Sequence, residues 1–252
     1  MLHFRLFGQA ELLSDDGTPL SSVLAQPKRL ALLAYLAAAR PTGFHRRDSL
    51  LGLFWPELDQ ERGRAALRQA LYTLRQALGN DVLLTRGDGE VAINTEKLSC
   101  DVVRFRSLLT SDPAAAADLY SGDVLNGFFI AEAPEFERWL EEERWLLRRE
   151  AAAAAWSVAE CIREKDVEAA ANWAARAAAL DPFNEEAVRR LMRLLADAGH
   201  RASALQIYQN FERLLERELE TAPSEETEQL AASLRISPKN GNGNGNGNGH
   251  AH

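Results

Sequence analysis

One segment, from Glu61 to Gly79, constrains the fold of this chain more than any other. At about 100° per residue, its apolar side chains fall within roughly 140° of one another, which is typical of a helix that packs on a core. They are Ala66, Leu67, Ala70, Leu71, Leu74, Ala77 and Leu78. Gly79 is a common residue just beyond a helix C-terminus. The pattern predicts a helix over 61–78 with one buried face.

The other half of this helix carries arginine and polar side chains, with no carboxylate after Glu61. Its members are Arg62, Arg64, Arg68, Gln69, Tyr72, Thr73, Arg75 and Gln76. A solvated helix face usually mixes both signs of charge, because acid–base pairs support the helix. Arginine can bond bidentately to guanine and glutamine to adenine, and threonine can contact a thymine methyl. The remaining arginines and the tyrosine can hold phosphates. We therefore expect this face to bind DNA.

The elements around this helix predict a winged helix-turn-helix. An alternating strand opens the chain, and a strand, an Asp16–Gly17 turn and a second strand follow it. Two further helices come before the arginine-bearing one, and a hairpin with a Gly-Asp-Gly tip comes after it. The expected ranges are 2–7 and 10–20 for the strands, Pro27–Ala39 and His45–Phe54 for the two helices, and 81–93 for the hairpin.

Five further basic residues stand where they could support DNA binding. Lys28 and Arg29 begin one helix, Arg46 and Arg47 begin the next, and Arg86 lies at the hairpin tip. Cations at a helix N-terminus oppose the helix dipole, so their placement there needs a reason. Contact with phosphate supplies one, because exposed N–H groups and cations then act together.

From about Val102 onward the sequence is almost entirely helical and contains a degenerate internal repeat. Residues 165–182 align with 199–216 at an offset of 34 residues, so that Ala170 falls on Ala204 and Ala174 on Tyr208. This period is that of tetratricopeptide helix pairs. Small residues at 170, 171, 174 and 177 would let paired helices approach closely. We expect a mainly α protein with small β elements, in which an all-α tetratricopeptide-like domain follows the winged helix.

Charge supports a division into domains. Residues 1–109 carry 14 basic and 12 acidic side chains, a net charge of +2; the whole chain has 29 and 37, so the remainder has 15 and 25, a net charge of −10. We expect a winged-helix domain over 1–100, a helical activator domain over 101–236 and a disordered Gly/Asn tail over 237–252. The tail is either a free end or a linker to a further domain. We also expect residues 1–109 to fold without the rest.

The succession of segments resembles the Streptomyces antibiotic regulatory protein (SARP) family. The N-terminal hundred residues are similar to its OmpR-like winged helix, and residues from about Asp101 to Leu234 to the bacterial transcriptional activator domain that follows it. The matching segments are "PKRLALLAYL", "RRDSLLGLFWPE", "RAALRQALYTLRQALG", "CDVVRFRSLL", "DLYSGDVLNGFF" and "EFERWLEEERWLL". The resemblance implies a transcription activator that binds double-stranded promoter DNA as a homodimer and engages RNA polymerase.

Other classes of function find little support in the sequence. No GxxxxGK[ST], GxSxG or HExxH motif occurs, so we expect no enzyme, no catalytic residues and no cofactor. Cys100 and Cys161 lie far apart without metal-ligand spacing, so we expect no metal site and a cytoplasmic protein. The acidic pair Glu141 and Glu143 is expected on a solvated helix face. No apolar run is long enough to span a membrane. The alternative function is a tetratricopeptide-type adaptor that binds proteins and not DNA.

Overall fold

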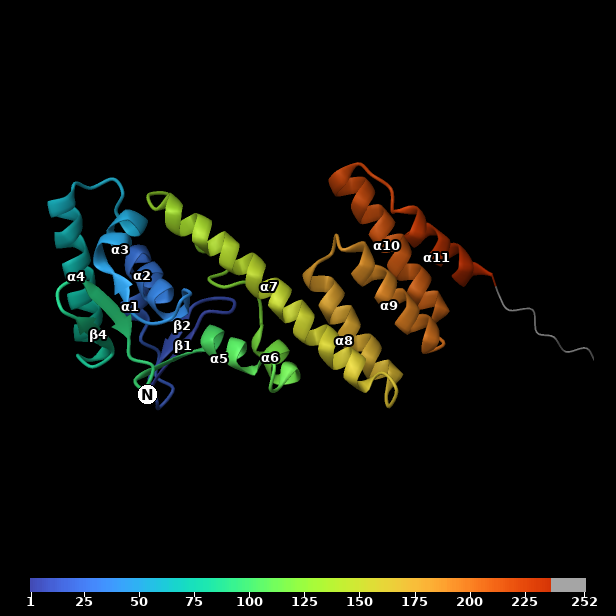
Figure 1. Cartoon of the computed structure of the whole chain (residues 1–252), viewed down its shortest axis with the longest axis horizontal. Coiled ribbons are helices and arrows are strands. Elements are labelled where there is room, and N and C mark those ends of the chain that lie inside the picture. Colours follow the sequence, from blue (N-terminus) through green and yellow to red (C-terminus); the bar gives the residue numbers. More distant parts are fainter. Residues whose placement is uncertain (237–252) are drawn as a thin grey trace, which may run out of the picture. The chain divides into compact units, whose positions relative to one another are not determined.

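The computed structural model describes residues 1–236 and divides into two compact units, Met1–Cys161 and the residues from Ile162 onward (Figure 1). The expected Gly/Asn tail over 237–252 lies outside the described residues. The structure confirms a mainly helical protein with few, short strands. Within the described residues, no helix is long and apolar enough to cross a membrane.

A three-stranded sheet in the order β2-β1-β6 contains the N-terminal strand. β1 (Leu2–Arg5) pairs antiparallel with β2 (Glu11–Leu13) and parallel with β6 (Leu98–Cys100). The second strand expected after the Asp16–Gly17 turn does not form. It is reduced to one bridge between Leu13 and Pro19, because proline has no backbone N–H to continue a ladder.

The second sheet, in the order β3-β5-β4, forms the wing. β4 and β5 are the expected hairpin, and β3 pairs with β5 through His45 and Val91. The helix expected to begin at His45 begins at Arg47 instead, because His45 and Arg46 are held in this strand. The bounds are His45–Arg46 for β3, Leu83–Arg86 for β4 and Glu90–Ile93 for β5.

Four helices lie between the strands. The expected three are present, and one short helix, α1, precedes them. The Asp59 carboxylate accepts a hydrogen bond of 2.9 Å from the Arg62 amide and so caps α4, while Gly79 ends α4 at a φ of 102°. The bounds are Ser21–Leu24 for α1, Pro27–Ala38 for α2, Arg47–Phe54 for α3 and Gln60–Leu78 for α4.

The apolar stripe of α4 is buried largely as the sequence predicts, and Gly63 is buried with it. The buried members of the stripe are Leu67, Ala70, Leu71, Leu74 and Leu78. Ala66 is only half-buried and Ala77 is exposed. Both lie at the same edge of the stripe, so the buried face is narrower than the helical wheel predicts.

Three more helices belong to the first unit: α5 (Asp101–Leu108), α6 (Pro113–Leu119) and α7 (Pro134–Ile162). Their aromatic side chains extend the core of the winged helix. The ring of Tyr35 on α2 lies 4.8 Å from that of Trp139 on α7, and the ring of Phe54 lies 5.2 Å from that of Phe136. A fragment ending at residue 109 would lose these contacts, so we expect it to be less stable than the whole first unit.

Polar contacts hold α5 to the end of β1 and to α7. The Asp101 carboxylate accepts hydrogen bonds of 2.9 Å from the Leu6 amide and 3.1 Å from the Phe7 amide, at the end of β1. The Arg106 guanidinium lies 2.7 Å from the Glu143 carboxylate of α7 and 3.2 Å from that of Glu150. Such charge-assisted contacts fix orientation more strongly than neutral ones do.

The expectation that Glu143 is solvated is wrong. Glu141 is exposed and pairs with Arg144, whereas the Glu143 side chain is only 5% exposed. Glu143 occupies the inward stripe of α7, between Leu140 and Leu147. Its carboxylate is therefore paired with Arg106 in the protein interior.

The second unit is a stack of antiparallel helices, in which α9 packs against α8, α10 and α11 (Figure 1). Ala170 on α8 and Ala204 on α10 are both fully buried, and Ala174 and Tyr208 are buried as well. These pairs confirm the equivalent positions of the tetratricopeptide-like repeat. The bounds are Val167–Leu180 for α8, Glu185–Asp197 for α9, Arg201–Leu219 for α10 and Glu225–Arg235 for α11.

The N-terminus of α11 is held to α9 by a small polar network. Ser224 and Thr227 donate hydrogen bonds to the Glu185 carboxylate, and Arg189 contacts both Glu185 and Thr227. Burial alone would raise the pKa of Glu185, but the hydrogen bonds from Ser224 and Thr227 outweigh it and hold the pKa below its ordinary value.

Candidate nucleic-acid interface

The helix-turn-helix consists of α3, the turn over residues 55–59, and α4. The buried stripe of α4 leaves its other side open to solvent. Five of the predicted site residues are clearly exposed on this helix, and their exposure follows from the 3.6-residue period. These are Arg62, Arg64, Arg68, Gln69 and Gln76, and Tyr72 joins them with 57% of its surface exposed. Thr73 and Arg75 are half-buried at the edge of the face.

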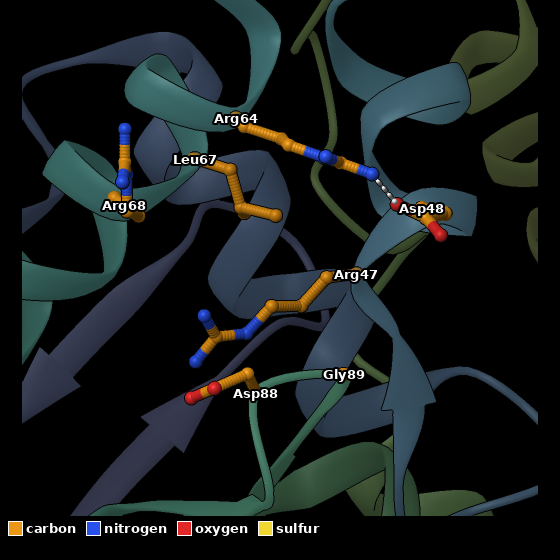
Figure 2. Close-up of a pocket in the computed structure, with 7 residues that line it drawn as sticks. All are labelled: Arg47, Asp48, Arg64, Leu67, Arg68, Asp88 and Gly89. Carbon is orange, nitrogen blue, oxygen red and sulfur yellow. Dashed lines mark ion pairs between the residues drawn. The ribbon is translucent and has the colours of Figure 1, made fainter. Parts of the chain in front are cut away.

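Three of the predicted arginines line one cavity of about 410 Å³. Arg64 and Arg68 project from successive turns of α4, and Arg47 projects from the first residue of α3 (Figure 2). The cavity is completed by Leu67 at its apolar side and by Asp88 and Gly89 of the wing turn (Figure 2). The helices α3 and α4 and the turn of the wing thus meet at one concave surface.

The arginine face of α4 has no acidic residue of its own after Glu61, but acidic side chains from neighbouring segments lie beside it. Arg64 Nη2 lies 3.5 Å from the Asp48 carboxylate, and Arg62 Nε lies 3.4 Å from that of Asp59. All four side chains are more than half exposed, so each pair contributes little to stability and can exchange partners at small cost. Asp48, Asp88 and Gly89 were not among the predicted site residues. These residues come close to Arg64 and Arg68 only when the chain folds, so the sequence pattern of α4 cannot identify them.

Arg86 occupies the wing as predicted. Its guanidinium lies 4.1 Å from the centre of the Phe44 ring and 3.4 Å from the Glu90 carboxylate, and its side chain is 68% exposed. Stacking on an aromatic ring orients a guanidinium without using its N–H donors. The donors that do not bond Glu90 remain available to an external anion.

The remaining basic residues are placed differently from one another. Arg46 is exposed beside the wing, whereas Arg29 and Arg47 are half-buried and each has a buried Nε without a hydrogen-bond partner. Lys28 is only 18% exposed, and its ammonium lies 2.7 Å from Glu57. The hydrogen bond from Lys28 lowers the pKa of the Glu57 carboxyl, so this cation is already neutralised.

Hydroxyl and amide groups on α4 are partly engaged within the helix. Thr73 Oγ1 donates a 2.9 Å hydrogen bond to the Gln69 carbonyl oxygen, and the Gln69 amide nitrogen lies 3.5 Å from Thr73 Oγ1. The methyl group of Thr73 does not take part in this bond. Among residues 1–236, no cluster of His, Cys, Asp and Glu could hold a metal ion.

Comparison with known proteins agrees with this architecture. The model of the bacterial transcriptional activator domain matches residues 101–235. A solved structure of Mycobacterium tuberculosis EmbR in complex with a low-affinity phosphopeptide is similar over 93% of this chain and 65% of that one, with 22% identity and a TM-score of 0.56. The chain thus spans less than two thirds of that protein's length. No curated protein gives a significant match.

These findings define a class of bacterial transcription regulators, in which a winged helix is followed by a helical activator domain. The chain belongs to the bacterial transcriptional activator domain family, and it is a regulator of the SARP type.

Proposed function

We propose that this regulator is an activator that binds double-stranded promoter DNA with α4. The observation that carries the proposal is the convergence of Arg47, Arg64 and Arg68 on one cavity between α3, α4 and the wing. A recognition helix places its N-terminal part deepest in the major groove. Arg64 and Arg68 lie in that part of α4, and both are exposed. A protein with this role acts in the cytoplasm, where bacterial promoters are.

Within this surface we assign different roles to different residues. Arg64, Arg68 and Gln69 contact base edges, because they are exposed near the start of α4. Arg75, further along α4, and Arg86 on the wing contact phosphates, with Arg46, Arg47, Arg62, Tyr72, Thr73 and Gln76 in support. We leave Lys28 out of the contact set because Glu57 already neutralises it. Arg29 stays a weaker candidate, since it is half-buried.

We also propose that the two domains have different binding partners. Residues 1–100 bind DNA, and residues 101–236 contact proteins, either RNA polymerase or a second protomer in a homodimer on DNA. The net charge of −10 over residues 110–252 supports this division, because an acidic surface repels the phosphate backbone. We propose no catalytic step for either part.

The experiment is a salt titration of binding to a short DNA duplex, measured by fluorescence anisotropy with the full chain. Neutralising phosphates with arginine releases counterions, so log K should fall linearly with log salt concentration, with a slope of about −0.9 per phosphate contact. A matched control is Arg138→Ala, which removes a 64% exposed arginine on α7 and should leave the slope unchanged.

The second candidate function, a protein-binding adaptor, rests on the helical stack of the second unit. It predicts no DNA binding at low salt by a folded protein and no dependence on salt. A measurable slope that becomes flatter by about two units in the Arg75→Ala, Arg86→Ala double variant would exclude the adaptor. A flat titration would contradict DNA binding.

A further inference from the structure

A second cavity, of about 520 Å³, lies in the first unit outside the arginine surface. Its walls come from the end of α2, the loop before β3, the strands β4 and β5, β6 and α5. A volume of this size is within the range of sites that bind small molecules. Nothing in the proposed DNA contact uses it.

The floor of this cavity is apolar. Leu36, Ala92, Ile93, Leu98 and Cys100 line it and are all buried. Burial, followed by the charge of Asp101, raises the pKa of the Cys100 thiol to about 12, so the sulfur is a neutral part of the wall at physiological pH. The floor therefore suits a hydrocarbon or aromatic group.

The rim of the cavity carries one cation. Among the described residues 1–236, Arg104, on α5, is the only charged residue that lines the cavity, and it is exposed. Two residues further along, Arg106 is paired with Glu143 and Glu150. Arg104 has no ion pair with any residue of the described range 1–236. Leu84 of β4, with 40% of its surface exposed, lies on the same rim.

We propose that this cavity binds a small amphipathic carboxylate, with its apolar body on the floor and its carboxylate at Arg104. An apolar pocket with one convergent charged group favours such a ligand, because burial of the body supplies affinity and the guanidinium fixes the orientation. The proposal concerns binding alone, so it stands independently of the proposed DNA contact.

A ligand in this cavity would also reach the wing. Phe44 lines the cavity, and its ring is the surface on which the Arg86 guanidinium stacks at 4.1 Å. A ligand that moves Phe44 would therefore change the position of Arg86. This consequence, unlike the binding itself, rests on the proposed function.

The test uses two fluorescent probes with the full chain: anilinonaphthalene sulfonate, which is anionic, and phenylnaphthylamine, which is neutral. Both should bind at one saturable site, and decanoate should displace both. Arg104→Gln should weaken the anionic probe and decanoate by about tenfold, the lower end of the effect of one lost charge-assisted hydrogen bond, because Arg104 is exposed. The same variant should leave the neutral probe unchanged.

Two more variants complete the design. Val103→Phe, which narrows the cavity, should weaken both probes, whereas Arg138→Gln removes an exposed arginine elsewhere in the unit and should change neither. Unchanged binding of both probes in Arg104→Gln and Val103→Phe would overturn the site. Equal weakening of the neutral and anionic probes in Arg104→Gln would overturn the carboxylate as ligand. Arg104 is exposed, so its variant folds even if Val103→Phe does not.

Discussion

Replacing Arg106 by methionine tests how the winged helix is joined to the helices that follow it. The Arg106 side chain is 14% exposed and that of Glu143 is 5% exposed, and their charged atoms lie 2.7 Å apart. Arg106 Nη1 also donates a 3.3 Å hydrogen bond to the Ala38 carbonyl at the end of α2. Removing the guanidinium would leave the Glu143 carboxylate buried without a cation.

Breaking a buried ion pair by removing one partner costs about 3–5 kcal/mol. Glu150 keeps a cation in the variant, because Arg40 lies 3.2 Å from it, so the loss is concentrated at Glu143. We therefore expect the free energy of unfolding to fall by about 3 kcal/mol, the lower end of this range. This corresponds to a fall of about 6–12 °C in the melting temperature of a unit this size. Urea and thermal unfolding, followed by circular dichroism, measure both quantities.

Two further variants make the result decisive. Arg106→Met combined with Glu143→Leu should recover most of the lost stability, because a buried pair can be replaced by apolar side chains at little cost. Arg138→Met removes a 64% exposed arginine and should change stability by no more than about 0.5 kcal/mol. If Arg106→Met is as stable as the wild type, or if the double variant is no better than the single one, the buried pair does not join these helices.

Three other predictions follow from the structure. Arg86→Ala should weaken binding to preferred and random DNA about equally and flatten the salt slope by about one unit; a changed base preference in binding assays would contradict its role at phosphate. The pKa of Glu185 is lowered in the folded protein, so its contribution to stability is present above the ordinary pKa of 4.5 and is lost as the pH falls through the folded value. In urea unfolding, the loss of stability of Glu185→Gln relative to the wild type should therefore be largest near neutral pH. A loss of stability that persists at low pH would argue against this linkage. A fragment of residues 1–161 should unfold cooperatively, whereas 1–109, which keeps α5 but lacks Phe136 and Trp139 of α7, should be markedly less stable by circular dichroism; equal stability would show that the core does not extend to α7.

Local patterns in the sequence predict most of the exposed arginine face of α4. The stripe of α4 identifies Leu67, Leu71 and Leu74 as buried, and the same period places Arg64 and Arg68 outside. Gly79 marks the end of the helix, and the Gly-Asp-Gly sequence marks the wing turn. Each of these signals depends on residues within a few positions of one another, so a single sequence contains them.

Features that depend on distant partners could not be predicted in this way. β6 forms because Leu98 pairs with Leu2, and His45 is in a strand because Val91 lies opposite it. Asp48 lies beside Arg64 only after α3 and α4 have packed. Glu143 is a partial exception, since its place between Leu140 and Leu147 in the inward stripe of α7 was visible in the sequence.

Selection of binding sites from random DNA, carried out in parallel with the wild-type chain and Arg68→Ala, tests the central claim most directly. Arg68 is exposed on α4 and lines the cavity between α3 and the wing. We expect the wild type to select a defined sequence, and Arg68→Ala to lose about 1–3 kcal/mol on it and to relax preference at one base pair, while remaining folded. A folded Arg68→Ala protein that selects the same sequence with unchanged affinity would contradict the claim that α4 reads DNA.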